Sequence, residues 1–473
     1  MKAVEWHVSC NTNVLSRLTE LHNGGDHPMT HSRTLIEFPF HGAPPVQARF
    51  DATPISSDGG APLLAALDRR LGLVDALAEA IEDPRDVRYT DHPLRDILRQ
   101  RIYQIALGYE DANDADTLRR DPVLKVACGR DPVRDGDLAS QPTLSRLENA
   151  LSPRACYRLA AALVARYVAA HPVAPRELVL DVDLTDDPTH GQQEFSAFHG
   201  FYDTHLYLPL LVFDQEGALL TAVLQPGKNP GVRVAVAVLK RLVQTLRQRW
   251  PSVRILVRAD GGMASPALYR FVETEGLDAL IGFPVNRRLA RKARRLQARA
   301  RRQFLRTGRK ARMFTSVTYR AREGWSRAYR IVLKAEHMAE GPNLRAVLTT
   351  LTSRAADVYD RYVERGEACE NSIKDFKGAL KMDRLSCHRF WANQVRLLLH
   401  AAAYQLLFAL RRCAKGTELA AAQFDTLRLR LLKIGAQVVG SVRRIVVHLS
   451  ASHPWQALWT LIARRIQRVA VDT

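Results

Sequence analysis

The amino-acid sequence predicts an α/β protein, in which a mixed sheet with flanking helices is interrupted by a β-rich insertion and preceded by a helical domain. Three patterns support this. Apolar residues recur at helical spacing over residues 62–171, short β-like runs alternate with helical patterns over 177–283, and three more β-like runs follow an arginine-rich segment. Strands in series, then a helix and another strand, are typical of an α/β layer.

Individual elements can be placed from the same patterns. Before the sheet, helices are expected over 61–80 and over 94–107, where Gly108 is a stop signal, with further helices opening near 141 and at Ser152-Pro153. The arginine-rich segment, residues 286–313, contains 13 Lys or Arg and no Asp or Glu. The expected strands are 177–185, 207–213, 219–224, 251–260, 279–283, 314–320, 329–336 and 344–351, and the later helices are 232–249, 265–275, 354–381, 390–412 and one from 455.

Composition favours a reduced, non-membrane protein. Hydrophobic residues make up 47% and charged residues 25%, a globular balance. The best apolar run, 397–410, contains His400 and Gln405 and suits a buried helix better than a membrane span. The N-terminus lacks a basic-then-apolar signal pattern, and none of the six cysteines forms a CxxC pair. We therefore expect a cytoplasmic protein with free thiols.

Net charge indicates the partner. Lys and Arg number 69 against 49 Asp and Glu, which gives a formal charge of +20. A basic surface concentrates a polyanion and speeds encounter with it, so nucleic acid is the expected partner. No basic amphipathic terminal helix supports an anionic membrane in its place. Residues 140–163 are then either a helix-turn-helix that binds DNA or part of a plain helical bundle.

Acidic residues at strand ends are the candidate catalytic groups. Asp181 and Asp183 lie two apart on one expected strand, so their side chains share a face. Asp260 ends a second strand, and Gly261-Gly262 lets the chain turn away. Sites in open α/β sheets favour strand ends. Phosphodiester cleavage uses two Mg²⁺ or Mn²⁺ ions about 4 Å apart, and such hard ions prefer carboxylate oxygens.

A third carboxylate is expected from a helix, and Glu370 is the candidate. On a continuous helix Glu370, Lys374, Lys377 and Lys381 fall on one face, which suits a metal followed by a phosphate backbone. The alternative is a solvated, salt-bridged helix. Glu367 is a further candidate for the third acid.

The segments around these acids resemble bacterial insertion-sequence transposases of the DDE group 1 family. The resemblance covers roughly residues 50–465. It is carried by DVDLTDDPTHGQQ from Asp181, RADGG from Arg258, ENSIKD from Glu370 and DRLSCHRFWANQ from Asp383. It implies a ribonuclease H-like catalytic domain, related to that of retroviral integrases, with an inserted β-rich subdomain between the second and third acids.

The resemblance also implies roles for single residues. The first acid precedes a Ser or Thr closely, which selects Asp183, before Leu184-Thr185, over Asp181; the second acid ends a strand, as Asp260 does. In the family, the third acid follows a Tyr and an Arg and precedes a Lys by seven positions. Glu370 matches the last spacing, because it precedes Lys377 by seven. It departs from the upstream spacing, since four residues separate Glu370 from Arg365 where the family has three. Tyr359, Tyr362 and Arg365 are the candidates for phosphate binding.

Two further features bear on DNA. The arginine-rich run, including Arg294, Arg295, Arg301 and Arg302, is either a phosphate-binding surface or a solvated helix face. Trp325 follows Gly324 between two inserted strands; related transposases stack a flipped base on such a Trp, and the alternative is a packing role. His190, His199 and His205 match no tight zinc spacing, so hydrogen-bonding or substrate-contacting roles are expected.

Together these observations predict a bacterial, nucleoid-associated transposase that uses two Mg²⁺ or Mn²⁺ ions. It would bind double-stranded DNA at the element's terminal inverted repeats and at the target, and act as a homodimer in the synaptic complex. The alternatives are a catalytically silent DNA-binding protein derived from a transposase and a nuclease without joining activity. The expected parts are a flexible tail (1–50), a helical DNA-binding domain (51–172), a catalytic domain (173–285 and 354–415), a basic β-rich insertion subdomain (286–353) and a basic helical C-terminal region (416–473).

Overall fold

The computed structural model describes residues 36–38, 46–48, 52–228, 232–321 and 324–469. The chain divides into two compact units, Met1–Thr53 and Pro54–Thr473. In the first unit, strand β1 (Ile36–Phe38) pairs antiparallel with β2 (Val46–Ala48). Most of the expected flexible tail lies outside the described residues.

Helices form the N-terminal part of the second unit, as predicted. The expected helix over 61–80 is divided in two because Gly72 adopts a left-handed φ of 58°. Ser152 caps α7 by accepting a hydrogen bond of 3.2 Å from the Ala155 amide, and Pro153 takes the first helical position. The helices are α1 (Ala61–Leu71), α2 (Leu73–Ala80), α3 (Leu94–Leu107), α4 (Ala115–Leu118), α5 (Pro122–Ala127), α6 (Gln141–Ala150) and α7 (Pro153–Ala169), with short 3-10 turns at Val87–Tyr89 and Ala112–Asp114.

An eight-stranded mixed sheet, ordered β12-β13-β14-β11-β10-β4-β8-β9, confirms the α/β prediction. β4 runs parallel to β10, and β10 parallel to β11; the other neighbours are antiparallel. The strand expected over 207–213 is interrupted at Leu208-Pro209, where proline has no amide hydrogen to donate. The strands are β4 (Glu177–Leu184), β8 (Leu210–Asp214), β9 (Leu219–Val223), β10 (Arg254–Ala259), β11 (Asp278–Phe283), β12 (Ala311–Tyr319), β13 (Tyr329–Met338) and β14 (Gly341–Thr349).

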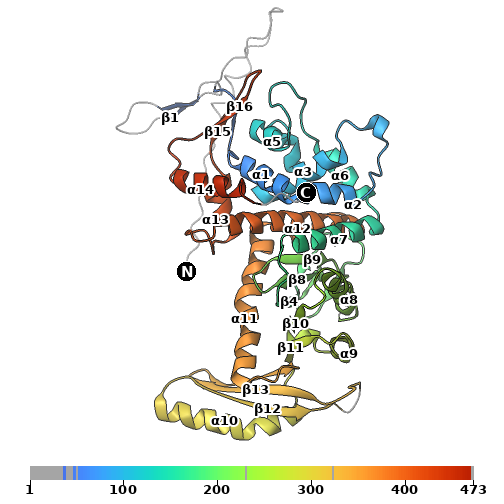
Figure 1. Cartoon of the computed structure of the whole chain (residues 1–473), viewed down its shortest axis with the longest axis vertical. Helices are drawn as coiled ribbons and strands as arrows, with labels where there is room; N and C mark the ends of the chain where they lie inside the picture. Colours follow the sequence, from blue (N-terminus) through green and yellow to red (C-terminus); the bar gives the residue numbers. More distant parts are fainter. Residues whose placement is uncertain (1–35, 39–45, 49–51, 229–231, 322–323, 470–473) are drawn as a thin grey trace, which may run out of the picture. The chain divides into compact units, whose positions relative to one another are not determined.

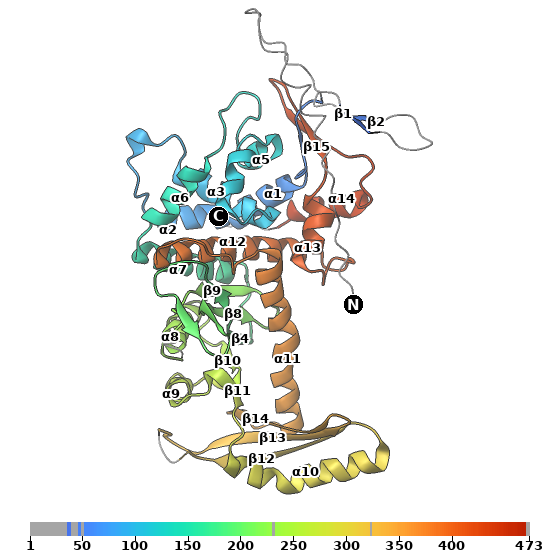
Figure 2. The same ribbon diagram turned by 180° about the vertical axis from the view of Figure 1, so that it is seen from behind.

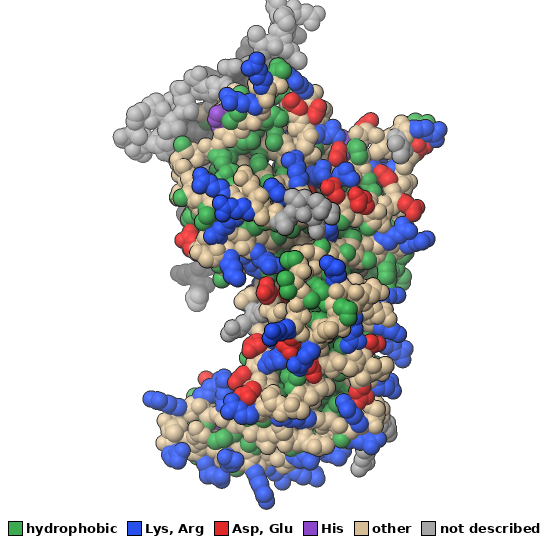
Figure 3. Space-filling view, viewed as in Figure 1, with side chains coloured by type: hydrophobic (Ala, Val, Ile, Leu, Met, Phe, Trp, Pro, Cys, Tyr) green, Lys and Arg blue, Asp and Glu red, His purple; other side chains and the backbone are tan. Residues whose placement is uncertain are grey.

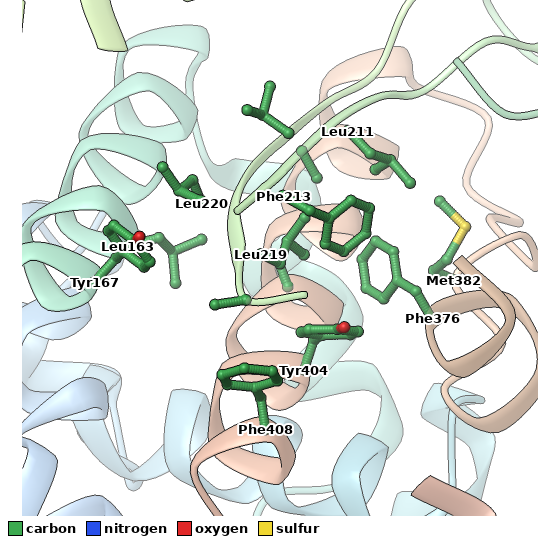
Figure 4. Packing of buried hydrophobic residues seen from close by; sticks show 14 of the residues in the cluster. Leu163, Tyr167, Leu211, Phe213, Leu219, Leu220, Phe376, Met382, Tyr404 and Phe408 are labelled. Atoms are coloured by element: carbon green, nitrogen blue, oxygen red, sulfur yellow. The ribbon is translucent and has the colours of Figure 1, made fainter. Parts of the chain in front are cut away.

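Helix α12 (Phe390–Cys413) lies between α1, α3 and α6 on one side and the sheet on the other, as both ribbon views show (Figure 1 and Figure 2). Most of its side chains are buried, which confirms the predicted buried helix. Figure 4 shows Tyr404 of this helix beside Phe213 of β8 and Phe376, and its ring centroid lies 5.8 and 5.5 Å from theirs. Among the described residues, no helix is both long enough and apolar enough to span a membrane.

Helices α8 (Val232–Arg249) and α9 (Pro266–Thr274) pack against each other beside the sheet. The 3-10 helix Gly261–Met263 connects β10 to α9. A small sheet of three short strands, ordered β5-β7-β6, follows β4: β5 (Asp187–Pro188), β6 (Ala197–His199) and β7 (Thr204–Tyr207).

The basic insertion extends the main sheet. β14 pairs with β11, so β12, β13 and β14 continue the sheet that carries the acids. Pairing satisfies backbone groups that would otherwise be exposed along the edge of β11. Helix α10 (Arg287–Thr307) covers β12 and β13 through an apolar stripe at helical spacing: Leu289, Ala293, Leu296 and Ala300.

The C-terminal region combines helices with a hairpin. β15 (Ala436–Gly440) pairs with β16 (Ile445–Leu449) and with β3 (Ile55–Ser56). Because it contains β15 and β16, the region is less uniformly helical than expected. Its helices are α13 (Phe424–Leu427), a π-helix over Arg428–Leu432, and α14 (Gln456–Ile466), which confirms the final helix.

Candidate active site

Two of the predicted acids meet at one edge of the sheet. In the parallel register of β4 and β10, Asp181 lies opposite Arg258. Two residues further along, on the same face, this register places Asp183 opposite Asp260. The Asp260 side chain accepts a 3.1 Å hydrogen bond from the Gly262 amide, so its orientation is fixed by the turn that follows.

Asp183 lies in an environment with opposing electrostatic effects. Its side chain is only 18% exposed, and this burial raises the pKa of its carboxyl; the nearby charge of Arg365 opposes that rise, and the carboxylate of Asp260 adds to it. The Nη2 atom of Arg365 lies 2.6 Å from Oδ2 of Asp183. Asp260 is therefore close enough for its carboxylate to raise the pKa of the Asp183 carboxyl.

Asp181 is engaged elsewhere. Both of its carboxylate oxygens accept hydrogen bonds of 2.7 Å, from Nε and Nη2 of Arg258, and both side chains are buried. Arg258 also donates to the carbonyl of Arg361, at 2.8 Å. The pair cancels two buried charges and ties β4 to β10 and helix α11. The sequence analysis missed Arg258, although it precedes Asp260 by two residues just as Asp181 precedes Asp183.

Helix α11 (Ala355–Lys374) presents Tyr362, Arg365 and Cys369 to the acids. The Sγ of Cys369 lies 3.8 Å from Oδ2 of Asp183. Gly282 on β11 is required for this packing, because an added Cβ would lie 2.5 Å from the Tyr362 hydroxyl. Tyr362 and Arg365 therefore lie beside the acids, and their phosphate-binding roles stay predictions.

Glu370 has a different position. It is exposed on α11 directly after Cys369, so about 100° of helical rotation separates the two residues. Across the described ranges, no group of three His, Cys, Asp or Glu residues could hold a metal ion. Glu367 lies on the same helix, but its side chain is outside the described residues. Glu370 as the third acid stays a prediction.

The expected stripe of lysines on one helix face is wrong. The α-helix changes at Asp375 into a π-helix that ends at Ala379, so the spacing of the stripe is lost. Lys374 is exposed, but Lys377 turns to the Asp186 carboxylate at 3.0 Å. Lys381 lies beyond the helix with a φ of 54°. A phosphate-binding role is better supported for Lys374 than for Lys377, which already has an anionic partner.

Trp325 is turned inward. It is 9% exposed and its ring lies edge-on to four aromatic neighbours, with centroids 5.1 to 5.7 Å away. This environment favours the packing alternative over base stacking. The neighbours come from α9, β11, β12 and β13: Tyr269, Phe283, Tyr319 and Tyr329.

The arginines of α10 point to solvent. Figure 3 shows Lys and Arg side chains gathered over this helix. Within the part of the chain that the structure describes, no carboxylate lies within ion-pair distance of Arg294, Arg295, Arg301 or Arg302, and all four are exposed. These exposed arginines without carboxylate partners are compatible with both alternatives, a phosphate-binding surface and a solvated helix face.

Helices α6 and α7 favour the bundle alternative for residues 140–163. Glu148 of α6 is buried and accepts hydrogen bonds from Arg101 of α3 (3.1 Å) and Arg396 of α12 (2.6 Å). α7 packs against α2, α12 and β9, so it is an integrated core helix. Cys128, Cys156, Cys369, Cys387 and Cys413 are free, as expected; Cys10 lies outside the described residues.

A mixed sheet flanked by helices, with two carboxylates meeting at the carboxyl ends of adjacent parallel strands, defines an α/β protein with an acidic site. The family model "Transposase DDE domain group 1" matches residues 38–471. The chain therefore belongs to this family of DDE-domain transposases. A comparison with curated proteins gave no match. Among solved structures, the chain is similar to the piggyBac transposase in its cryo-EM synaptic complex with hairpin DNA, with a TM-score of 0.42 and 11% identity over 78% of this chain and 80% of that one.

Proposed function

We propose that the chain is the transposase of a bacterial insertion sequence, and that it binds the element's terminal inverted repeats and catalyses strand cleavage and strand transfer. The family match over most of the chain supports the class of activity. The observation that carries the site is the register of β4 and β10, which brings Asp183 and Asp260 together. We infer that β9-β8-β4-β10-β11 forms the ribonuclease H-like core that the resemblance implies.

The chemistry of the site fits divalent cations. Asp183 and Asp260 offer hard carboxylate oxygens at one sheet edge, and Glu370 is the proposed third ligand. When bound, two Mg²⁺ or Mn²⁺ ions would activate the attacking oxygen and stabilise the departing 3′-oxygen. Arg365 favours the ionised, ligating form of Asp183 by opposing the burial that raises its pKa.

The residues around the acids would position the DNA strand. The Tyr362 hydroxyl and the Arg365 guanidinium lie beside the acids, and Lys374 is exposed on the same helix. α10 adds a basic surface that suits the phosphates of element ends or target DNA. Water or a strand 3′-hydroxyl would attack phosphorus in line, without a covalent protein–DNA intermediate.

The deciding experiment is strand transfer with labelled element-end DNA in Mg²⁺. Cleavage with joining supports the transposase, cleavage alone indicates a nuclease, and binding without either indicates a silent DNA-binding protein. Mg²⁺ and Mn²⁺ should support the reaction, whereas Ca²⁺ should allow assembly with little chemistry because its looser geometry positions an in-line attack poorly. Full activity in EDTA would overturn the metal-dependent mechanism. Sizing of the assembled complex tests the proposed homodimer, and fractionation of bacterial cells tests the nucleoid location.

A further inference from the structure

Between Asp183 and β8 the chain carries an unusual concentration of exposed aromatic rings. The exposed fractions are 62% for Phe195, 51% for Phe198, 84% for Phe201 and 38% for Tyr202. Contiguous patches of large, exposed apolar side chains mark interaction surfaces. Phe195 lies just before β6, and the other three rings belong to the hairpin of β6 and β7.

The hairpin is fixed at its root. β7 pairs with β5, which begins three residues after β4 ends. The Glu194 carboxylate accepts a 2.9 Å hydrogen bond from the Phe390 amide, the Glu194 amide donates to the His388 carbonyl, and the Tyr207 hydroxyl donates to the Glu194 carbonyl. An anchored root with exposed rings at the tip suits binding of a ligand by a preformed surface.

The two faces of the hairpin differ. Phe198 lies directly opposite His205, and these exposed rings occupy one face. Tyr202 contacts His199, with centroids 5.2 Å apart, and belongs to the other face. Phe201 lies edge-on to Tyr202 at 5.0 Å. The tip turn that presents both residues is completed by Asp203, which adopts a left-handed φ of 51°.

Tyr202 lies within electrostatic range of the acids. Burial raises the pKa of its hydroxyl, and the carboxylates of Asp186, Asp183 and Asp260 raise it further. The hairpin grows from the end of β4 at the sheet edge that holds Asp183, so a ligand at the tip would adjoin the acidic site. Phe198 lies on the opposite face of the hairpin, directly across from His205.

The chemistry of the tip selects one kind of ligand. Residues 195–205 contain no Lys or Arg, so the hairpin offers no permanently charged cation for a phosphate. Flat aromatic rings instead stack on nucleobases, and such stacking tolerates every base. We propose that Phe201 and Tyr202 form a base-stacking platform for an unpaired nucleotide next to the acidic site of Asp183 and Asp260. This inference rests on the proposed action on DNA.

The test measures binding in EDTA, where no cleavage occurs. The probes are forked DNA duplexes that differ only in carrying a base or an abasic site at each unpaired position of the junction. Wild type should bind the base-containing probe about 5- to 150-fold more tightly at one or two positions, the range expected for a stacked base. The double variant Phe201→Ala/Tyr202→Ala should bind both probes equally.

Phe198→Ala is the matched control, since it removes the same ring from the opposite face and should keep the preference. Equal melting temperatures would show that all variants fold. A wild type without any base preference, or a double variant that keeps it, would overturn the platform. Strand transfer in Mg²⁺, measured separately on wild type, shows whether the proposed function itself has failed.

Discussion

Arg258 donates two hydrogen bonds of 2.7 Å to the two carboxylate oxygens of Asp181, and both side chains are buried. The carboxylate of Asp181, the first of the two acids on β4, is therefore occupied by Arg258. Asp183, the second acid, is the one that lies beside Asp260. The carboxylates that differ by two positions therefore have separable roles, one structural and one proposed to be catalytic.

The two acids of β4 should respond differently to substitution. Asp183→Asn and Asp260→Asn should abolish cleavage and change DNA-end binding by no more than a few fold, since each removes a ligand but little of the phosphate-binding surface. Asp181→Asn should lower the free energy of unfolding by about 3 to 5 kcal/mol, because it removes the buried counter-charge of Arg258 and leaves this arginine with the solvent-exposed Glu364 carboxylate, 3.5 Å away. Denaturant melts and cleavage assays measure both effects.

The double variant Asp181→Leu/Arg258→Leu is the control for this contrast. Replacing both charges by apolar groups should recover much of the lost stability. Loss of cleavage in a stable Asp181 variant would contradict the assignment and make Asp181 the first acid.

Arg365 should set the acidic limit of activity. Arg365→Ala removes the charge that opposes the rise in the pKa of Asp183, so this pKa should rise further. Because the ionised carboxylate is the proposed ligating form, the acidic limb of the pH–rate profile should move to higher pH. Arg361→Ala, on the same helix but paired with Glu177, should leave the limb in place. If the acidic limb of the pH–rate profile is unchanged in Arg365→Ala, Arg365 does not control the protonation of Asp183 during the reaction.

Glu370 should prove essential although it is exposed in this structure. Glu370→Gln should abolish cleavage, and Cys369→Ser should not. Deleting Cys369 leaves three residues between Arg365 and the acid and rotates Glu370 by about 100° toward Asp183, so the deletion variant should keep cleavage. If Glu370→Gln still cleaves DNA, Glu367 is the next residue to test.

The basic surface of α10 should determine the salt dependence of DNA binding. Neutralising four of its exposed arginines removes four potential phosphate contacts, each worth about 0.9 in the slope of log affinity against log salt. The slope should fall by roughly three to four units, and similarly for end and scrambled duplexes because phosphate contacts carry no sequence information. The four are Arg294, Arg295, Arg301 and Arg302.

A matched control neutralises four exposed arginines that already have carboxylate partners, and it should leave the slope nearly unchanged. An unchanged slope in the α10 variant would mean that this helix face is merely solvated. The control residues are Arg88, Arg95, Arg158 and Arg354.

Trp325 should behave as a packing residue. Trp325→Ala should cost about 3 to 5 kcal/mol of folding free energy, since it empties an aromatic cluster. Trp391→Ala, at a ring that is 39% exposed, should cost less. The alternative role in base stacking predicts a different result: normal thermal stability of Trp325→Ala with slower cleavage at the element end.

The sequence alone determined the features that depend on local pattern. Helix α8 begins and ends at Val232 and Arg249 as predicted, because apolar spacing and helical geometry act over a few residues. The carboxyl ends of β4 and β10 were placed within one residue, which put Asp181, Asp183 and Asp260 near strand ends, whereas the choice of Asp183 over Asp181 came from the family resemblance.

Only the tertiary structure decided how distant residues pair. Whether Asp181 is free depends on the register of two strands more than 70 residues apart, which matches it to Arg258. Trp325 turns inward because rings from four separate elements surround it. Lys377 leaves the predicted stripe because the helix widens at Asp375, whose carboxylate accepts hydrogen bonds from Arg411 and the Phe424 amide. Local periodicity cannot encode these outcomes, since each is set by partners brought together only when the chain packs.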